Sequence, residues 1–323
     1  MRCFVTGGTG FIGSYVVKSL VEAGIEVVAL YHSKSTSRWL DEMLTEEERE
    51  LLVLEQGDMT DAERIRKLIV DYGCDSVAHL ASRLNQKTRA NPTDGVQTNI
   101  VAFQNLLEIC KMEKLRRLVW ASSSAGYGVQ SDRKRRYGDG NEESMDERTP
   151  LCPGSLYSYT KVFNEGLSEF YRKEYGLDSI ALRVNLSYGP YIMSSFQPFF
   201  SSIIDQPAVG AASRVPYSDT MFDFQYVGDM ADIFRDALLA PPTQSGIFNT
   251  RGEYRPVKDA IEFIRSVLPE TDIQPLGGDM DIPFHFDTSA LEQEIGYKPS
   301  HTMEQGLLAS INMVRRSRGL EEL

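Results

Sequence analysis

The sequence is poor in the residues that hold metals or cross-link chains. Its 323 residues include four cysteines and four histidines. The cysteines are Cys3, Cys74, Cys110 and Cys152, and no two of them form a CxxC pair or stand beside a histidine cluster. We therefore expect neither a metal site nor a disulfide framework, and this usage is typical of a protein of the reducing cytoplasm.

Long apolar runs and an excess of positive charge are also missing. No run approaches the ~18 apolar residues of a membrane-spanning helix, and no basic and then apolar stretch typical of a secretory signal precedes the first strand-like segment. The net charge is −12, and an acidic chain is repelled by nucleic acid and by anionic membranes. We therefore expect a small molecule as partner, with no nucleic acid and no membrane.

The chain does contain a regular alternation of strand-like and helix-like segments. Apolar, β-branched segments predict strands at residues 2–6, 25–31, 51–56, 76–81, 118–122 and 179–184. Helical periodicity predicts helices at residues 14–23, 61–71, 93–112 and 157–175. This alternation is typical of an α/β fold in which a doubly wound parallel sheet carries helices on both faces.

Beyond about residue 190 the pattern becomes irregular, with prolines in loops and helices expected near 228–239, 256–267 and 302–316. Single cores stop growing near ~250–300 residues. We therefore expect a main domain at residues 1–185, to which segments near 222–250 return, and a smaller α/β substrate lobe that takes most of 186–323.

Residues 130–147 carry four consecutive basic side chains, at positions 133–136, followed by a run of acids. We interpret this segment as a solvated loop. The alternative is a lid whose arginines meet an anionic substrate, because the segment follows a strand and lies near the carboxyl ends of the strands, where such sheets bind ligands.

A glycine-rich loop joins the first strand to the first helix. Its sequence, TGGTGFIG, places Gly7, Gly10 and Gly13 with GxxGxxG spacing. These glycines allow a tight turn, a close approach of backbone to a pyrophosphate and close packing of helix on strand, and the phosphates then meet the helix N-terminus at Phe11 and Ile12. The loop predicts a Rossmann-type NAD(P) site.

The end of the second strand bears on the choice between NAD and NADP. It reads Tyr31, His32, Ser33 and Lys34, with no acid to hold the adenosine ribose. Because hydroxyls and cations accept a 2′-phosphate, we favour NADP slightly over NAD. After the third strand come Asp58 and Met59. We expect Asp58 to contact the adenine, to cap the next helix, or to do both.

A tyrosine and a lysine stand one helical turn apart at the start of the 157–175 helix. Tyr157 and Lys161 share a face of that helix. A free tyrosine has a pKa of ~10, and a neighbouring ammonium favours its phenolate. Tyr157 can then exchange a proton with an alcohol or ketone as hydride is transferred at carbon. A serine from the run Ser122, Ser123, Ser124 ends the fifth strand and is positioned to hold the substrate oxygen.

With these residues together, the chain resembles the extended short-chain dehydrogenase/reductases, the NAD-dependent epimerase/dehydratase family. The resemblance rests on TGGxGFIG, on a strand ending SSxxxYG, on the YxxxK pair and on later YGP and YVxD segments. Counting back from Tyr127 of the YG pair, the resemblance places the catalytic hydroxyl on Ser123, with Ser124 as fallback. It also implies cofactor contacts from Leu80, Ala81, Ser82, Asn99 and Ser122.

The resemblance further implies bound NAD or NADP and a homodimer formed by the 93–112 and 157–175 helices. Many members act on nucleotide sugars, and others oxidise or reduce small alcohols and ketones. The departures from the family pattern lie on the substrate side. Leu186 stands where the family has an asparagine, and Phe222 stands where it has an arginine for a diphosphate. A second family arginine precedes a Gly-Asp pair, and the matching stretch here, from Leu276 to Asp279, contains no arginine.

These departures favour a substrate without a diphosphate, because buried phosphates need charge-assisted partners. We therefore predict a dehydrogenase or reductase for a small, non-nucleotide alcohol or ketone, contacted by Leu186, Arg214, Phe222 and Ser124. The aromatic side chains of the region form either an apolar pocket or ordinary core. One alternative is a nucleotide-sugar 4-epimerase or reductase whose phosphate contacts are relocated to Arg214, Arg251, Arg255 or residues 133–136. The other is a non-catalytic cofactor sensor.

Overall fold

The computed structural model describes residues 1–32, 38–138, 144–192 and 197–323. Two predicted cofactor residues, Ser33 and Lys34, lie outside these ranges. None of the helices in the described ranges is long and apolar enough to cross a membrane.

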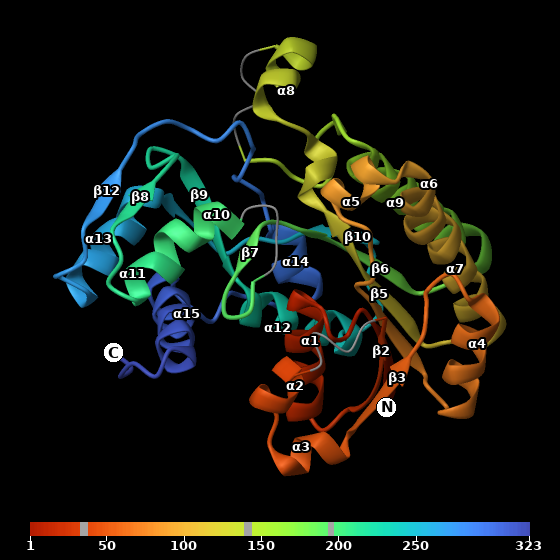
Figure 1. Cartoon of the computed structure of the whole chain (residues 1–323). Helices are drawn as coiled ribbons and strands as arrows, with labels where there is room; N and C mark the ends of the chain where they lie inside the picture. The colour runs from red at the N-terminus through yellow and green to blue at the C-terminus, as the bar shows by residue number, and fades with distance from the viewer. Residues whose placement is uncertain (33–37, 139–143, 193–196) are drawn as a thin grey trace.

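The centre of the molecule is a sheet of seven parallel strands (Figure 1). Their spatial order is β10-β6-β5-β4-β1-β2-β3. The strands are β1 (Arg2–Thr6), β2 (Glu26–Tyr31), β3 (Leu52–Gln56), β4 (Ser76–His79), β5 (Arg117–Ser123), β6 (Ser179–Val184) and β10 (Ile247–Asn249). All neighbours pair in parallel, so the predicted α/β fold with a parallel sheet is confirmed.

Helices cover both faces of this sheet. On one face pack α1 (Phe11–Glu22) and α12 (Val227–Leu239), and on the other α4 (Ala62–Asp71), α7 (Ala102–Met112) and α9 (Leu156–Tyr175) (Figure 1). The sequence dictates this division, because alternate residues of a strand face opposite sides. In β1, Cys3 and Val5 enter the apolar cluster of α1 and α12, while Phe4 enters that of α4, α7 and α9.

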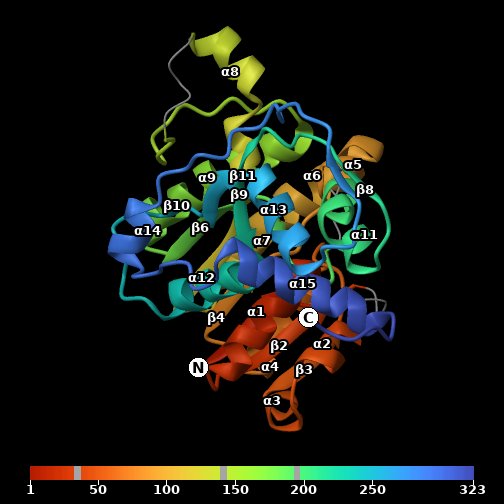
Figure 2. The same cartoon turned by 90° about the vertical axis from the view of Figure 1, so that its left-hand side faces the viewer.

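The later part of the chain adds two small sheets beside the main one (Figure 2). The first has the order β11-β9-β7, from β11 (Glu253–Pro256), β9 (Met221–Tyr226) and β7 (Ser187–Tyr188), and the second pairs β12 (Ile273–Pro275) with β8 (Ser213–Val215). The helices near them are α10 (Gln197–Phe200), a π-helical turn η4 (Ser201–Asp205), α11 (Gln206–Ala208), α13 (Val257–Val267) and α15 (Met303–Ser317). The helix α14 (Ser289–Glu294) lies against β10 of the main sheet.

Short helices complete the chain. They are α2 (Arg38–Met43), α3 (Glu46–Glu50), α5 (Asn85–Ala90), α6 (Pro92–Val96), the π turn η2 (Gln97–Val101), the 3₁₀ turn η3 (Ser124–Tyr127) and α8 (Gln130–Tyr137). The predicted 93–112 helix is thus one helical stretch that begins at Pro92 and contains a π turn.

The interpretation of 130–147 as a solvated loop was wrong at its start, because α8 occupies residues 130–137. Arg133 points inward from α8 and donates to the carbonyl oxygens of Tyr127 and Pro150 at 3.0 and 2.7 Å. Its buried guanidinium therefore anchors the helix, while Arg135 is exposed and pairs with Asp132. Residues 139–143 lie outside the described ranges, so the lid interpretation stays a prediction.

Candidate active site

The glycine loop is packed so tightly that two of its positions exclude a side chain. Gly7 has φ +69°, and a Cβ there would lie 2.9 Å from the backbone nitrogen of Ala81. A Cβ on Gly13 would lie 2.0 Å from the carbonyl oxygen of Gly7. Gly10 is the N-cap of α1 and offers no side-chain cap, and the first turn, which includes Phe11 and Ile12, contains no acid. The positive end of the helix dipole thus faces the loop uncompensated, which suits a pyrophosphate.

The second wall of the loop comes from the end of β4. The Thr6 hydroxyl accepts hydrogen bonds from the backbone nitrogens of Leu80 and Ala81, each at 3.2 Å. His79 lies 2.8 Å from the same hydroxyl. Burial, with the charge of Lys161, lowers the pKa of His79 to about 3, so the ring is neutral and acts as a structural partner.

Asn99 ties this wall to α9. Its Oδ1 accepts from the Ser82 hydroxyl and the backbone nitrogen of Arg83, and its Nδ2 donates to the Thr160 hydroxyl at 3.2 Å. The π turn directs the Asn99 carbonyl oxygen to Asn164 Nδ2, 2.7 Å away. Asn99 therefore fixes the helix that carries Tyr157 and Lys161, and its amide is fully used by protein groups.

An acid does lie beside the end of β2, although it comes from the loop after β3. His32 Nε2 is 3.5 Å from Asp58 Oδ2. Asp58 also accepts from the backbone nitrogen and hydroxyl of Thr60, and the backbone bond is the largest of the effects that lower its pKa. The cap of α4 is Asp61, so the expectation that Asp58 caps this helix was wrong. Tyr31 and Met59 are buried beside this strand end.

Tyr157 and Lys161 lie together on the first turns of α9. The helix begins at Leu156 because Ser155 and Ser158 form a capping box. Lys161 Nζ lies 5.6 Å from the centroid of the Tyr157 ring and donates to the carbonyl oxygen of Ala121 at 2.7 Å. Burial lowers the pKa of Lys161 to about 8. Burial also raises the pKa of Tyr157, and its hydrogen bond with Ser123 lowers it.

The three consecutive serines at the end of β5 have three different partners. The Ser123 hydroxyl is the one that meets Tyr157. The Ser122 hydroxyl donates away from the loop to Glu165 Oε1 at 2.6 Å. The Ser124 hydroxyl donates to Asn185 Oδ1 at 2.9 Å. Among the described residues, the structure thus brings Ser123, Tyr157 and Lys161 together at the carboxyl edge of the sheet.

Sequence reasoning missed the charged pair behind this group. Glu165 lies one turn beyond Lys161 and receives two hydrogen bonds from Arg183, at 2.9 and 2.8 Å. Arg183 also donates to the Tyr127 hydroxyl at 2.6 Å. The only signal in the sequence was the repetition of polar residues at positions 157, 161 and 165, which places all three on one face of a helix.

The predicted substrate residues are not gathered at one place. Phe222 has no exposed surface and packs against Phe199 and Phe284. Its assignment as a substrate contact was therefore wrong, because the aromatic cluster is core. Arg214 pairs with Asp272 in the small β12-β8 sheet. Leu186 is partly buried against the same large apolar cluster that holds Phe222.

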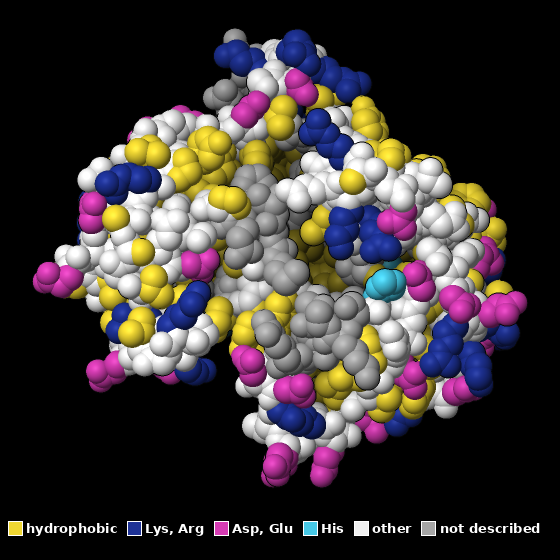
Figure 3. Space-filling view, in the orientation of Figure 1, with side chains coloured by type: hydrophobic (Ala, Val, Ile, Leu, Met, Phe, Trp, Pro, Cys, Tyr) yellow, Lys and Arg dark blue, Asp and Glu magenta, His cyan; other side chains and the backbone are white. Residues whose placement is uncertain are grey.

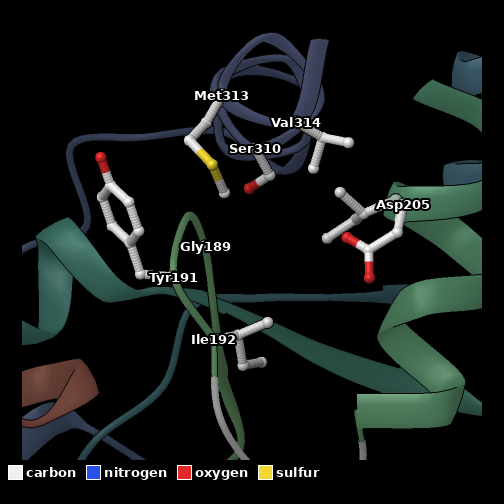
Figure 4. A pocket seen from close by; sticks show the side chains of 8 residues that line it. Gly189, Tyr191, Ile192, Asp205, Ser310, Met313 and Val314 are labelled. Carbon is white, nitrogen blue, oxygen red and sulfur yellow. The ribbon is translucent and has the colours of Figure 1, made fainter. Parts of the chain in front are cut away.

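Figure 3 shows a hollow at the centre of one face, between the small sheets and the layers of the main sheet. Hydrophobic side chains line its depth, and lysine and arginine side chains stand at its edge (Figure 3). A second, separate cavity of about 140 Å³ lies between η4, α15 and the end of β7 (Figure 4). It is lined by Tyr191, Asp205, Ser310 and Met313 among others and contains none of the predicted site residues.

Among the residues in the described ranges, no group of three histidine, cysteine, aspartate or glutamate side chains is placed to hold a metal ion. The four cysteines are buried and free.

Comparison with known proteins agrees with this geometry. The model of the NAD dependent epimerase/dehydratase family matches residues 3–249. UDP-glucuronate 4-epimerase 1 of Arabidopsis thaliana is 32% identical over 94% of this chain and 74% of its own length. UDP-glucuronate 4-epimerase 3 of the same plant is 30% identical over the same shares.

Solved structures show the same fold. The UDP-glucuronic acid 4-epimerase of Bacillus cereus, in complex with NAD, superposes with a TM-score of 0.79 at 24% identity, over 98% of this chain and 99% of its own. The UDP-glucose 4-epimerase of Thermus thermophilus, also in complex with NAD, gives 0.77 at 23% identity, with the same coverage. The chain therefore belongs to the NAD-dependent epimerase/dehydratase family and is an NAD(P)-dependent enzyme of the extended short-chain dehydrogenase/reductase type.

Proposed function

We propose that this protein is an NAD-dependent 4-epimerase of UDP-sugars, with UDP-glucuronate as the first substrate to test. The observation that carries this proposal is the contact of Ser123 with Tyr157 and the nearby Lys161, in a chain whose relatives at 30–32% identity are UDP-glucuronate 4-epimerases over nearly its whole length. The comparisons favour this nucleotide-sugar reading, which the sequence offered as an alternative, over a small non-nucleotide substrate.

The side chains suit such a reaction. Tyr157 as phenolate takes the proton of the sugar C4 hydroxyl and returns it to the ketone after the sugar has turned. Lys161, held by the Ala121 carbonyl oxygen, supplies positive charge that favours the phenolate. Ser123 holds the C4 oxygen beside Tyr157. Bound NAD supplies a hydride acceptor and then a hydride donor, so the net reaction consumes no cofactor.

The diphosphate requires cations other than the two that the family pattern places at position 222 and in the stretch 276–279. Arg255 pairs with Glu304 and Asp259, and Arg214 with Asp272. Arg251 donates to the carbonyl oxygen of Phe286. Within the described ranges it forms no salt bridge, although its charge acts on Asp223 and Asp287. Arg251 is therefore our candidate for the diphosphate, because its guanidinium keeps donors for an anion.

For the cofactor we propose NAD rather than the NADP that the end of β2 suggested. Asp58 stands 3.5 Å from His32, so a carboxylate lies beside the strand end that meets the adenosine ribose. A carboxylate there repels a 2′-phosphate. Thermal shift with NADH and NADPH tests this choice: NADH must stabilise the protein more at equal concentration.

We further propose that the protein is a homodimer. Tyr159, Phe163 and Phe170 of α9 are about half exposed and share one face of the helix, and Met112 at the end of α7 is exposed too. Such a row of apolar side chains is typical of an interface. Light scattering gives the oligomeric state, and Phe163→Glu must convert a dimer to a monomer.

One observation favours the alternative of a small, non-nucleotide alcohol or ketone. Phe222 is buried in the core and Leu276 is apolar and 62% exposed, so neither side chain offers a charge to a diphosphate. A thermal-shift panel on NAD-loaded protein separates the two. A ligand at ~100 times its dissociation constant adds ~2.7 kcal/mol of stability. We expect a shift with UDP that Arg251→Ala abolishes. No shift with UDP, GDP or dTDP would sink the nucleotide-sugar proposal.

A further inference from the structure

A chain of three hydrogen bonds joins the end of β5 to the small β11-β9-β7 sheet. The Ser124 hydroxyl donates to Asn185 Oδ1 at 2.9 Å, and Asn185 Nδ2 donates to Asp223 Oδ2 at 2.9 Å. The backbone nitrogen of Gly252 donates to Asp223 Oδ1 at 2.6 Å. The chain begins at a partly exposed serine next to Ser123 and ends at a carboxyl with no exposed surface.

The chemistry of Asp223 sets the direction of every bond in this chain. Burial raises the pKa of Asp223 to about 7. Above that pH the carboxylate is ionised and only accepts hydrogen bonds. Asn185 must therefore turn its Nδ2 to Asp223 and its Oδ1 to Ser124. An amide oxygen only accepts, so Ser124 must give its proton to Asn185. The Ser124 oxygen is left with lone pairs for whatever lies in front of it.

When Asp223 is ionised, its burial makes this direction strict. Its two hydrogen-bond partners are an amide and a backbone nitrogen, and Arg251 acts on it by charge alone. A buried carboxylate without an ion pair depends on each of its donors. Asn185 is also nearly fully buried, so water does not compete for its amide. Turning the amide would set its oxygen against the carboxylate.

We propose that Asp223, acting through Asn185, fixes Ser124 as a hydrogen-bond acceptor for a hydroxyl or amide N–H of the substrate. Asp223 and Asn185 are positioning residues, and Ser124 is the residue that contacts the substrate. This inference rests on the proposed function for the identity of the sugar. It adds to that function a preference for a donor group, rather than a carboxylate oxygen, in front of Ser124.

Asp223→Asn tests the direction of these hydrogen bonds, because it keeps the shape of the side chain and removes its charge. Gly252 still donates to the oxygen of the new amide, so the new Nδ2 faces Asn185. Asn185 must then turn and donate to Ser124, which becomes a donor to the substrate. At pH 8.5 we expect kcat/KM to fall at least tenfold, with unchanged NAD affinity. The kcat/KM of Ser124→Ala must fall by a similar factor. In the double variant, adding Asp223→Asn to Ser124→Ala must change kcat/KM less than twofold.

A control stands two residues from Asn185. The Ser187 hydroxyl is buried and has no hydrogen-bond partner within the described ranges, so Ser187→Ala must leave kcat/KM unchanged. If Asp223→Asn lowers kcat/KM by the same factor in the Ser124→Ala background as in the wild type, Asp223 acts on the fold and the proposal is overturned. Wild-type activity in Asp223→Asn overturns it too.

A readout without substrate separates this inference from the proposed function. In protein labelled with ¹⁵N-asparagine, the side-chain amide signal of Asn185 is identified by its loss in Asn185→Ser. The signal must move in Asp223→Asn and in Ser124→Ala, and stay in place in Ser187→Ala. An unmoved signal in either of the first two variants contradicts the relay. Moved signals in a protein that converts no UDP-sugar would overturn the proposed function and leave the relay standing.

Discussion

Glu165 and Arg183 form a buried ion pair directly behind Lys161. Their side chains are 6% and 3% exposed, and the closest contact is 2.8 Å. Glu165 raises the pKa of Lys161, against the larger lowering by burial. The pair therefore helps to keep an ammonium beside Tyr157, and it joins α9 to β6 at the carboxyl edge of the sheet.

Removing one member of this pair leaves the other charge buried and alone. Glu165→Gln should destabilise the protein by roughly 3–5 kcal/mol, as when a buried pair is broken. Asp71→Asn, which breaks the exposed Lys67–Asp71 pair, should cost less than about 0.5 kcal/mol. Urea denaturation measures both. Equal costs would mean that the Glu165–Arg183 pair adds no more than a surface pair.

Tyr157→Phe removes the proton-transfer group and little else. We expect the rate of hydride transfer to fall by about 10²–10⁴-fold, while NAD binding, measured by fluorescence titration, stays within twofold. Tyr159→Phe on the exposed side of the same helix is the matched control and should keep full activity. Substantial turnover by Tyr157→Phe would rule out the assigned mechanism.

Gly13→Ala tests the close packing of the cofactor loop. The new Cβ would lie 2.0 Å from the Gly7 carbonyl oxygen, whereas a Cβ on Gly154 meets its nearest atom at 3.7 Å. We expect Gly13→Ala to lose cofactor binding at least tenfold, because the loop must move, and Gly154→Ala to bind normally. Isothermal titration with NADH compares them. Normal binding by Gly13→Ala would show that the loop tolerates displacement.

Asp223 makes stability depend on pH in a defined direction. Burial raises its pKa from the ordinary 3.8 to about 7. Between those values the folded protein holds a proton that the unfolded chain has released, so stability falls as pH rises through this window and levels off above pH 7. Asp223→Asn lacks this effect. Its stability relative to the wild type should therefore rise from pH 5 to pH 7, by at most about 1.4 kcal/mol per pH unit. A constant difference in urea denaturation would contradict this.

The sequence predicted the parts of the site that local pattern controls. The glycine spacing and the Tyr157–Lys161 pair specify the loop and the start of α9 because backbone conformation and helical periodicity act over a few residues. Counting within the family pattern also selected Ser123 over Ser124, and in the structure the Ser123 hydroxyl is the one that meets Tyr157.

Contacts between distant segments could not be predicted in the same way. Asp58 reaches the end of β2 from the loop after β3, and no rule of spacing connects the two. Phe222 was predicted to contact the substrate because it stands where the family has an arginine for a diphosphate, but its side chain packs in an aromatic core. The direction of the Asn185 amide depends on Asp223, a residue on another sheet.

The most direct test of the account is to incubate the purified protein with UDP-glucuronate, without an added electron acceptor, and to follow the sugar by ¹H NMR. We predict conversion to the C4 epimer, UDP-galacturonate, until the two UDP-sugars reach a constant ratio, with no net change in NADH absorbance. The proposal would be contradicted if UDP-glucuronate, UDP-glucose and UDP-galactose all stayed unchanged while a small alcohol gave stoichiometric NADH. That result would identify the protein as a dehydrogenase.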